Sequence, residues 1–266
     1  MAIARGAVWF ALTATLAGTG TDAAPGGARA SGARWIELVP GARLATLDDG
    51  SVRLDLLRFD LERFDVEVVV AAHERPPHAR VWLPGPGHTA AQVVTSAGGG
   101  GAGAVVAAVN GGFFDENGRS LGLRVTHGDV ATGLRGRVDW GVFYVAGGRA
   151  RIVHSRDFAL RDGIDAAVQV GPRILVDGVV PKLKPQFARR TGIALDREGK
   201  TVTLVISDRA IEAASLGSRL AALGFHSALL LDGGPSTQIA AAIGGQRVDI
   251  PGGYPVPDLV AIVRRR

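Results

Sequence analysis

The sequence predicts an α+β fold, with mixed and antiparallel β-sheets, a few helices and a single domain. Three observations support this class. Apolar and polar residues alternate in several short segments, glycine-containing turns separate pairs of apolar runs, and only two segments have helical character. The chain has 266 residues, of which 47% are hydrophobic and 21% charged, so it can bury a substantial core.

The strands are predicted from two kinds of apolar pattern. Val52, Leu54 and Leu56 alternate with polar residues, and residues 64–70 repeat the alternation, as antiparallel strands with one exposed face do. Residues 104–109 are continuously apolar, which predicts a strand buried on both faces. We expect hairpins at the turns "GG" (147–148), "DG" (177–178) and "DREG" (196–199).

The two helical segments are shorter and less regular than the strands. Residues 88–97 have helical character and are followed by a glycine-rich break. A better helix is predicted over residues 209–223, where Gly224 is well placed to end it, because glycine readily adopts the left-handed conformation found after helices.

The first residues predict an exported protein. Arg5 precedes a short apolar stretch and then small residues, which is the organisation of a secretory signal peptide. We therefore expect a signal peptide over residues 1–23, a linker over 24–34 and one domain over 35–266, with the mature protein periplasmic or secreted. The alternative is a frayed terminal helix in a cytoplasmic protein. No segment is long and apolar enough to predict a membrane span.

Composition excludes several classes of function. The chain has no cysteine, which rules out disulfides, thiolate metal sites and cysteine nucleophiles. Its formal net charge is +5, but the basic residues are dispersed along the chain and include three arginines at its end. Because nucleic-acid-binding proteins gather their positive charge on one face, we expect no nucleic-acid partner.

Two apolar strands end on a polar residue and two glycines. Asn110 is followed by Gly111 and Gly112 in "VNGGFF", and Asp232 is followed by two glycines in "LLLDGGPST". Paired glycines allow positive φ angles and a close approach of the backbone to a ligand, and exposed amides in such turns bind anions. The alternative is a pair of tight turns capped by Asn110 and Asp232.

Arginines follow or precede glycine-containing turns in two further segments. Arg173 lies in "QVGPRIL", and Arg190 precedes Thr191 in "RRTGIALD". A guanidinium matches phosphate or carboxylate geometry, and a neighbouring hydroxyl adds a donor. Each arginine taken alone would also fit a solvated surface position.

In this order, "VNGGFF", "GPRIL", "RRTGIAL" and "LLLDGGPST" resemble the phosphodiester glycosidase family, over residues 35–266. The resemblance implies an α+β domain that hydrolyses a sugar-1-phosphodiester and releases the sugar from a phosphate-bearing partner. Pro235 stands where many members have a further glycine. It removes one amide donor and stiffens the turn, which affects substrate scope more than chemistry.

The matching residues suit that reaction. Asp232 would activate water or face the sugar, Asn110 would hold sugar hydroxyls or orient the water, and Arg190 with Arg173 would neutralise the departing phosphate. Asp115 is a second, weaker carboxylate candidate. The expected catalytic residues are Asp232, Asn110 and Arg190, and the expected substrate-binding residues are Gly111, Gly112, Phe113, Asp115, Gly171, Arg173, Thr191, Gly233, Gly234, Ser236 and Thr237.

No cofactor is expected to be required. A divalent cation is an option, because Asp232, Asp115 and Asn110 offer oxygen ligands, but their spacing matches no known cation-binding loop. Two functions remain open for the same residues. One is an exported glycosidase acting on a carbohydrate phosphodiester, and the other is a non-catalytic glycan- or phosphate-binding accessory protein in exopolysaccharide assembly.

Overall fold

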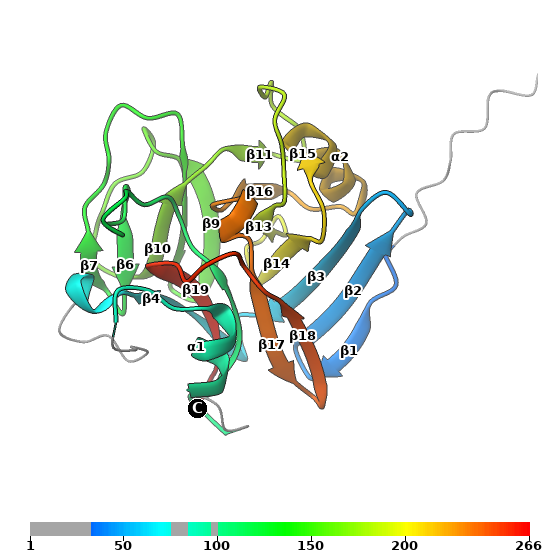
Figure 1. Cartoon of the computed structure of the whole chain (residues 1–266), viewed down its shortest axis with the longest axis horizontal. Helices are drawn as coiled ribbons and strands as arrows, with labels where there is room; N and C mark the ends of the chain where they lie inside the picture. The colour runs from blue at the N-terminus through cyan, green and yellow to red at the C-terminus, as the bar shows by residue number, and fades with distance from the viewer. Residues whose placement is uncertain (1–32, 76–84, 97–100) are drawn as a thin grey trace, which may run out of the picture. The chain divides into compact units, whose positions relative to one another are not determined.

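The computed structural model describes residues 33–75, 85–96 and 101–266. The predicted signal peptide and all but the last residues of the predicted linker lie outside the described residues, so both stay predictions. Residues Gly32–Arg266 form one compact unit. Within the described residues the regular structure consists of four antiparallel β-sheets and two α-helices (Figure 1), with two short 3₁₀-helices, η1 (Ala72–Glu74) and η2 (Gly234–Ser236). The predicted antiparallel sheets are confirmed, whereas the helical share is smaller than an α+β class implies.

The largest sheet has seven strands, which come from two separate parts of the chain. Its first three strands form a meander, and the hairpin predicted at residues 196–199 supplies two of the central strands. In spatial order the strands are β1 (Ile36–Val39), β2 (Ala42–Asp48), β3 (Arg53–Asp60), β14 (Thr201–Ser207), β13 (Thr191–Leu195), β16 (Ser227–Leu230) and β11 (Arg173–Leu175).

The second sheet has five strands, and the apolar strand predicted over residues 104–109 lies at its centre. This strand, β5, is buried along its whole length, as its continuous apolar sequence requires. In spatial order the strands are β18 (Gln246–Ile250), β17 (Ile239–Ile243), β5 (Val105–Asn110), β19 (Asp258–Arg264) and β4 (Phe64–Val70).

The third sheet also has five strands and contains the hairpin predicted at residues 147–148. Both glycines of that turn have positive φ angles, 56° and 70°, which explains the glycine pair. In spatial order the strands are β7 (Asp129–Thr132), β6 (Arg124–Thr126), β10 (Ile164–Val170), β8 (Gly141–Ala146) and β9 (Arg149–His154), and a separate pair is formed by β12 (Phe187–Ala188) and β15 (Ile211–Glu212).

The hairpin predicted at residues 177–178 is confirmed only in part. Asp177 and Gly178 do form a turn, but it joins Val176 to Val179 by a single bridge. The strand before the turn, β11, pairs with β16 instead, so a long-range partner overrides the local turn signal.

Both helices begin later than predicted, for different reasons. Helix α1 (Ala90–Ser96) starts after Thr89, whose hydroxyl accepts a hydrogen bond from the Gln92 amide while Gln92 Oε1 accepts one from the Thr89 amide, a reciprocal cap. Helix α2 (Ala213–Ala222) starts four residues after the predicted position because residues 211–212 pair as strand β15. As predicted, Gly224 follows the end of this helix with a φ of 81°.

The core lies between the three large sheets. Phe59, Val68, Phe143, Val168 and Ile262 come from different strands of these sheets and belong to one buried cluster. The outer face of the seven-stranded sheet is covered by α2, and α1 packs against the outer face of the second sheet (Figure 1). No helix within the described ranges combines the length and apolar character needed to cross a bilayer.

Candidate active site

Strand ends from the three large sheets meet at one rim. Asn110 ends β5, and its side chain bonds to Thr191 at the start of β13 and to Asp232, two residues after β16. Arg124 begins β6 and pairs with Asp258, which begins β19. Because antiparallel neighbours run in opposite directions, the end of one strand lies beside the start of the next. The fold thus gathers residues that are far apart in the chain.

Asn110 links three segments and is fully buried. Its Nδ2 donates to the Asp232 carbonyl at 2.8 Å, and its Oδ1 accepts from Thr191 Oγ1 at 2.7 Å and from the Gln238 amide at 3.1 Å. Since its exposed fraction is 0%, the side chain has no face left for a sugar or a water molecule. The expectation that Asn110 contacts substrate is corrected: the geometry makes it a positioning residue for Asp232.

Asp232 is half-buried and keeps its carboxylate at the rim. Its Oδ1 accepts the Gly233 amide at 2.9 Å. Burial, reinforced by the nearby Asp258 charge, raises the pKa of Asp232, while hydrogen bonds from Ser236 and Gly233 and the charge of Arg124 act in the opposite direction. A carboxyl group with a raised pKa, reachable from solvent, is suited to take up and release a proton.

Arg190 is a buried cation next to the turn that carries this carboxylate. Its Nε donates to the Ile211 carbonyl at 3.3 Å and its Nη2 donates to the Gln186 carbonyl, and its exposed fraction is 6%. A Cβ placed on Gly233 would lie 3.6 Å from Nη1, which brings the guanidinium next to the Asp232 turn. Burial lowers the pKa of Arg190, and within the described part of the chain it forms no ion pair with a carboxylate.

Arg173 and its neighbours lie at the adjacent part of the rim. Arg173 begins β11, which pairs with β16 just before Asp232. Its stem lies against Gly141, where a Cβ would come within 2.8 Å of Arg173 Cγ, and the buried Gly171 lies against Trp140. Phe113 packs edge-on against Trp140, with 5.0 Å between ring centroids, and joins the core only partly.

Asp115 serves a local turn. Its Oδ1 accepts the amides of Asn117 and Arg119, both at 2.9 Å. This is the turn-capping role that its short acidic side chain favours. The structure therefore does not support Asp115 as a second carboxylate of the site.

The amides of both glycine pairs are already used inside the protein. Gly111 N–H donates to the Asp258 carbonyl and Gly112 N–H to Asp258 Oδ1, at 2.9 and 2.8 Å. Gly233 N–H donates to Asp232 Oδ1, and Gly234 N–H donates to the Arg189 carbonyl at 2.9 Å. The prediction that these turns present amides to an anion is wrong. Positive φ is found at Gly234 alone of the four.

The hydroxyl residues after the second glycine pair are buried under a short extended segment. Ser236 Oγ lies 3.1 Å from the Tyr254 hydroxyl, and Gly253 donates to the Pro235 carbonyl at 2.8 Å. Thr237 is fully buried. Tyr254, which the sequence did not point to, keeps 43% of its surface exposed beside the Asp232 turn.

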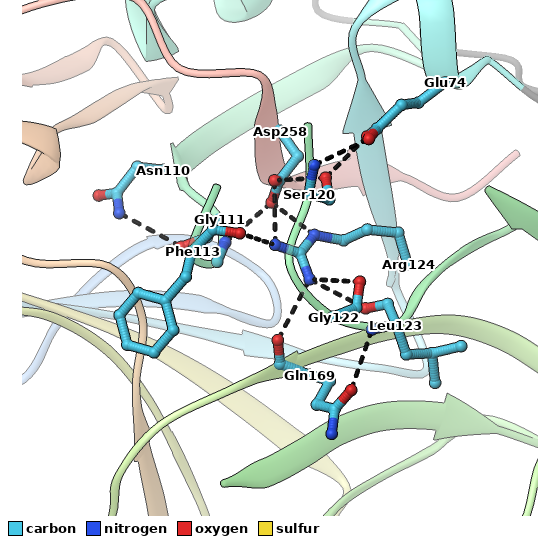
Figure 2. Close-up of polar contacts among 11 residues, drawn as sticks. Glu74, Asn110, Gly111, Phe113, Ser120, Gly122, Leu123, Arg124, Gln169 and Asp258 are labelled. Atoms are coloured by element: carbon cyan, nitrogen blue, oxygen red, sulfur yellow. Dashed lines mark hydrogen bonds and ion pairs between the residues drawn. The ribbon is translucent and has the colours of Figure 1, made fainter. Parts of the chain in front are cut away.

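The sequence did not predict the buried ion pair between Arg124 and Asp258, which lies against the two glycines that follow Asn110. Figure 2 shows Arg124 at its centre, with Nε 2.9 Å from Asp258 Oδ1 and Nη2 3.1 Å from Oδ2. Both side chains have no exposed surface. The pair explains the first glycine pair, because a Cβ on Gly111 would lie 1.7 Å from Asp258 Oδ1 and one on Gly112 would lie 2.4 Å from Arg124 Nη2.

The side chains of Ser120 and Glu74 and two backbone carbonyls complete this network (Figure 2). Ser120 Oγ lies 3.2 Å from Asp258 Oδ2 and 2.7 Å from Glu74 Oε2. Arg124 Nη1 donates to the Gln169 carbonyl at 3.2 Å and to the Leu123 carbonyl at 3.0 Å. One sequence signal for Asp258 exists, since it directly precedes the apolar run "LVAIV" and so mirrors the polar residues that end β5 and follow β16.

The oxygen ligands suggested for a divalent cation do not converge. Asn110 Oδ1 is occupied by Thr191 and the Gln238 amide, and Asp115 is occupied by its own turn. In residues 33–75, 85–96 and 101–266, no group of three or more histidine, aspartate or glutamate side chains could hold a metal ion.

Comparisons with known proteins support the fold. The fold is similar to the catalytic domain of zebrafish N-acetylglucosamine-1-phosphodiester alpha-N-acetylglucosaminidase, with a TM-score of 0.60, 16% identity and coverage of 84% of this chain and 82% of that one. It is also similar to a hypothetical protein from Synechocystis, with a TM-score of 0.59, 15% identity and coverage of 92% and 64%.

In sequence, the chain is 34% identical over 108 residues to the uncharacterized protein YigE of Escherichia coli K12, a match that spans 36% of this chain and 42% of that protein. The family model described as phosphodiester glycosidase matches residues 103–263, which contain the strand ends and both glycine turns of the rim. The chain therefore belongs to the phosphodiester glycosidase family.

Proposed function

We propose that this protein is an exported glycosidase that hydrolyses a sugar-1-phosphodiester in a glycan or cell-envelope polymer. Membership of the phosphodiester glycosidase family supports the reaction class. The zebrafish protein of similar fold is named for the same type of bond, which links an amino sugar to a phosphodiester. The observation that carries the proposal is the half-buried Asp232 in a turn whose Gly233 lies against Arg190, a buried guanidinium with no carboxylate partner among the described residues.

Asp232 fits the role of the carboxylate that activates water. Water attacks the anomeric carbon and gives its proton to Asp232 while the bond from that carbon to the phosphate oxygen breaks. The phosphate monoester departs with the bonding electrons. The transition state has positive charge on the sugar, which an ionised carboxylate stabilises. Burial raises the pKa of Asp232, and this favours proton uptake in the transition state.

Arg190 fits the role of the cation that receives the phosphate. Removing a guanidinium from water is costly unless charge or hydrogen bonds compensate, and here two backbone carbonyls supply only part of that compensation. A phosphodiester beside Gly233 would bring the missing negative charge. Because a departing phosphate monoester is a weak base, it needs such neutralisation more than it needs a strong acid. Arg173, at the adjacent strand start, would add a second cation.

Export is the part of the proposal that concerns residues 1–23. The short apolar stretch after Arg5 supports a signal peptide whose removal leaves a mature chain starting near Ala24. Mass spectrometry of the protein isolated from its native cell should find that mature N-terminus in the periplasmic or secreted fraction. An intact Met1 in the cytoplasmic fraction would contradict export and leave the chemistry unaffected.

A panel of sugar-1-phosphodiesters tests the reaction. The purified protein should release free sugar from at least one member, and the folded Asp232→Asn variant should bind the same compound with little turnover. Binding by the unmodified protein with no turnover of any member would instead favour the non-catalytic glycan- or phosphate-binding function. A panel that includes different sugars and different second esters also identifies the preferred partner of the bond.

A further inference from the structure

We propose that the buried Arg124–Asp258 ion pair is the positioning element of Asp232, which it holds in place through Gly111, Gly112 and Asn110. The inference rests on the proposed function for its effect on turnover. Its structural part concerns the free protein. The two charged residues begin different strands, β6 and β19, and neither was among the expected site residues.

The first step runs from the ion pair to the turn after β5. Asp258 accepts the amides of both Gly111 and Gly112, one on its carbonyl and one on its carboxylate. Arg124 holds that carboxylate by a hydrogen bond from Nη2 and an ion-pair contact from Nε, and its Nη1 donates to the Gln169 and Leu123 carbonyls. The turn is therefore held at two successive amides by a group that has no exposed surface.

The second step runs from that turn to Asp232. The Asp232 amide donates to the Gly111 carbonyl at 3.0 Å, and the Asp232 carbonyl accepts from Asn110 Nδ2 at 2.8 Å. Both backbone groups of Asp232 are thus bound by the two residues that immediately precede Gly112. A shift of the turn would move the carboxylate with it, and small displacements of a reacting group reduce catalysis strongly.

Stability alone does not account for the buried Arg124–Asp258 ion pair. A fully buried ion pair contributes little net stability compared with apolar side chains of the same size, because both charges lose their hydration. An apolar pair could fill the same space, but it could not accept the Gly112 amide on a side-chain oxygen or fix that oxygen with a guanidinium. The pair therefore provides directional contacts where the backbone before Asp232 needs them.

The ion pair also acts on the charge of Asp232. Asp258 raises the pKa of Asp232 and Arg124 lowers it, with the contribution of Asp258 the larger of the two. The other groups that act on Asp232 are the Ser236 side chain and the Gly233 amide, and the Arg190 guanidinium lies near Gly233. Glu74 faces Asp258 from the far side, through Ser120.

The unmodified protein provides the first test, by hydrogen exchange followed by NMR. The amides of Gly111, Gly112 and Asp232 should exchange as slowly as those at the centre of β5, because all are held by the same buried network. Exchange of Gly111 and Gly112 at the rate of exposed turns would overturn the proposal without any variant having to fold.

The second test uses Asp258→Asn, which keeps an oxygen acceptor for Gly112 but removes the charge. The Asp232 carboxyl, followed by carbon-13 NMR, should titrate at lower pH than in the unmodified protein, and the amide signals of Gly111 and Asp232 should shift. The double variant Arg124→Met/Asp258→Asn leaves no unpaired buried charge, serves if the single variant fails to fold, and should move the titration in the same direction by less.

The matched control is Glu67→Gln. Glu67 is also a buried carboxylate, with Oε2 3.1 Å from His127 Nε2, and it lies on β4 opposite Ala261, away from the Asp258 end of β19. This variant should leave the Asp232 titration and the Gly111 amide unchanged. A folded Asp258→Asn protein with the titration and amide signals of the unmodified protein would overturn the inference.

Turnover separates this inference from the proposed function. With an active substrate, Asp258→Asn should lower kcat about tenfold with KM within about twofold, because it moves the carboxylate and leaves the phosphate contacts. If the unmodified protein hydrolyses no sugar-1-phosphodiester, the proposed function fails, and the exchange and titration results still decide whether the ion pair positions Asp232.

Discussion

The two glycine turns of the rim have nearly the same sequence pattern and opposite roles. Asn110-Gly111-Gly112 is completely buried, and each of its side-chain and amide groups is bound within the protein. Asp232-Gly233-Gly234 is half-buried and presents a carboxylate at the surface. The first turn positions the second one, because Asn110 and Gly111 bind the backbone of Asp232. An apolar strand that ends on a polar residue and two glycines thus predicts a tightly packed turn. Whether the polar side chain of that turn is exposed decides whether it can contact a ligand.

The glycines differ in the same way. Gly111 and Gly112 are required because neighbouring charged side chains occupy the space of a Cβ, and neither has a positive φ. Gly234 has a φ of 61° and open space around its Cβ position, so its requirement is conformational. Substitutions should separate these two causes by the size of their effects.

Gly111→Ala should have the largest effect on stability. The new methyl group would overlap the Asp258 carboxylate, and relief of that clash would break a buried ion pair, so we expect a loss of about 4 kcal/mol or more in the free energy of unfolding. Chemical denaturation measures it. Gly133→Ala, where no atom lies within 4 Å of the Cβ position, is the control and should change stability by less than about 0.5 kcal/mol. Equal stabilities would refute the packing role of Gly111.

Asp232→Asn should have the largest effect on activity. Loss of the charge should lower turnover about a hundredfold or more, roughly 3 kcal/mol of transition-state stabilisation, with the fold retained. Since the pKa of Asp232 is raised in the folded protein, its contribution to stability is present at low pH and is lost as pH rises through that pKa. The variant should therefore gain stability relative to the unmodified protein between acid and neutral pH. Urea unfolding at both pH values, with kinetics alongside, checks both expectations.

Arg190→Lys should have an intermediate effect. Lysine keeps the charge but loses the planar fork that binds the carbonyls of Gln186 and Ile211, so we expect about a tenfold fall in kcat/KM, partly as a higher KM. Arg197→Lys, in the exposed turn between β13 and β14, is the matched control and should leave both constants unchanged. A variant with normal KM and normal kcat would remove Arg190 from the proposed phosphate contact.

Gly234→Ala should have the smallest effect. Alanine is strained at positive φ, but the space at this position is open, so we expect a loss of about 1 kcal/mol in the free energy of unfolding. Activity should fall only as far as the Asp232 turn shifts. A loss as large as that of Gly111→Ala would mean that the two turns are held alike, contrary to the comparison above.

Much of the fold could be predicted from the sequence because local residue patterns determine many of its strands and turns. The apolar run of β5, the glycine pair of the β8–β9 hairpin and the stop at Gly224 are all encoded by neighbouring residues. The shortened helix α2 and the single-bridge length of the Asp177 hairpin could not be predicted, because β15 and β11 pair with distant strands. The local sequence does not indicate which distant strand each segment pairs with.

The candidate site was predicted in part for the same reason. Asp232 and Arg190 stood out because an ionisable residue next to an apolar strand is unusual. Asn110 stood out equally, but its burial is set by Thr191, Gln238 and Asp232, which the sequence alone cannot bring together. Arg124 and Asp258 are 134 positions apart in the sequence, so neither residue could be recognised as the partner of the other from the sequence alone.

Hydrolysis in oxygen-18 water tests most directly the claim that Asp232 activates water at the sugar and Arg190 receives the phosphate. With a sugar-1-phosphodiester that the protein cleaves, attack at the anomeric carbon places the label in the released sugar and leaves the phosphate monoester unlabelled, as mass spectrometry of both products would show. We predict that result. Label in the phosphate monoester would mean that the bond from phosphorus to oxygen breaks, and would contradict the account.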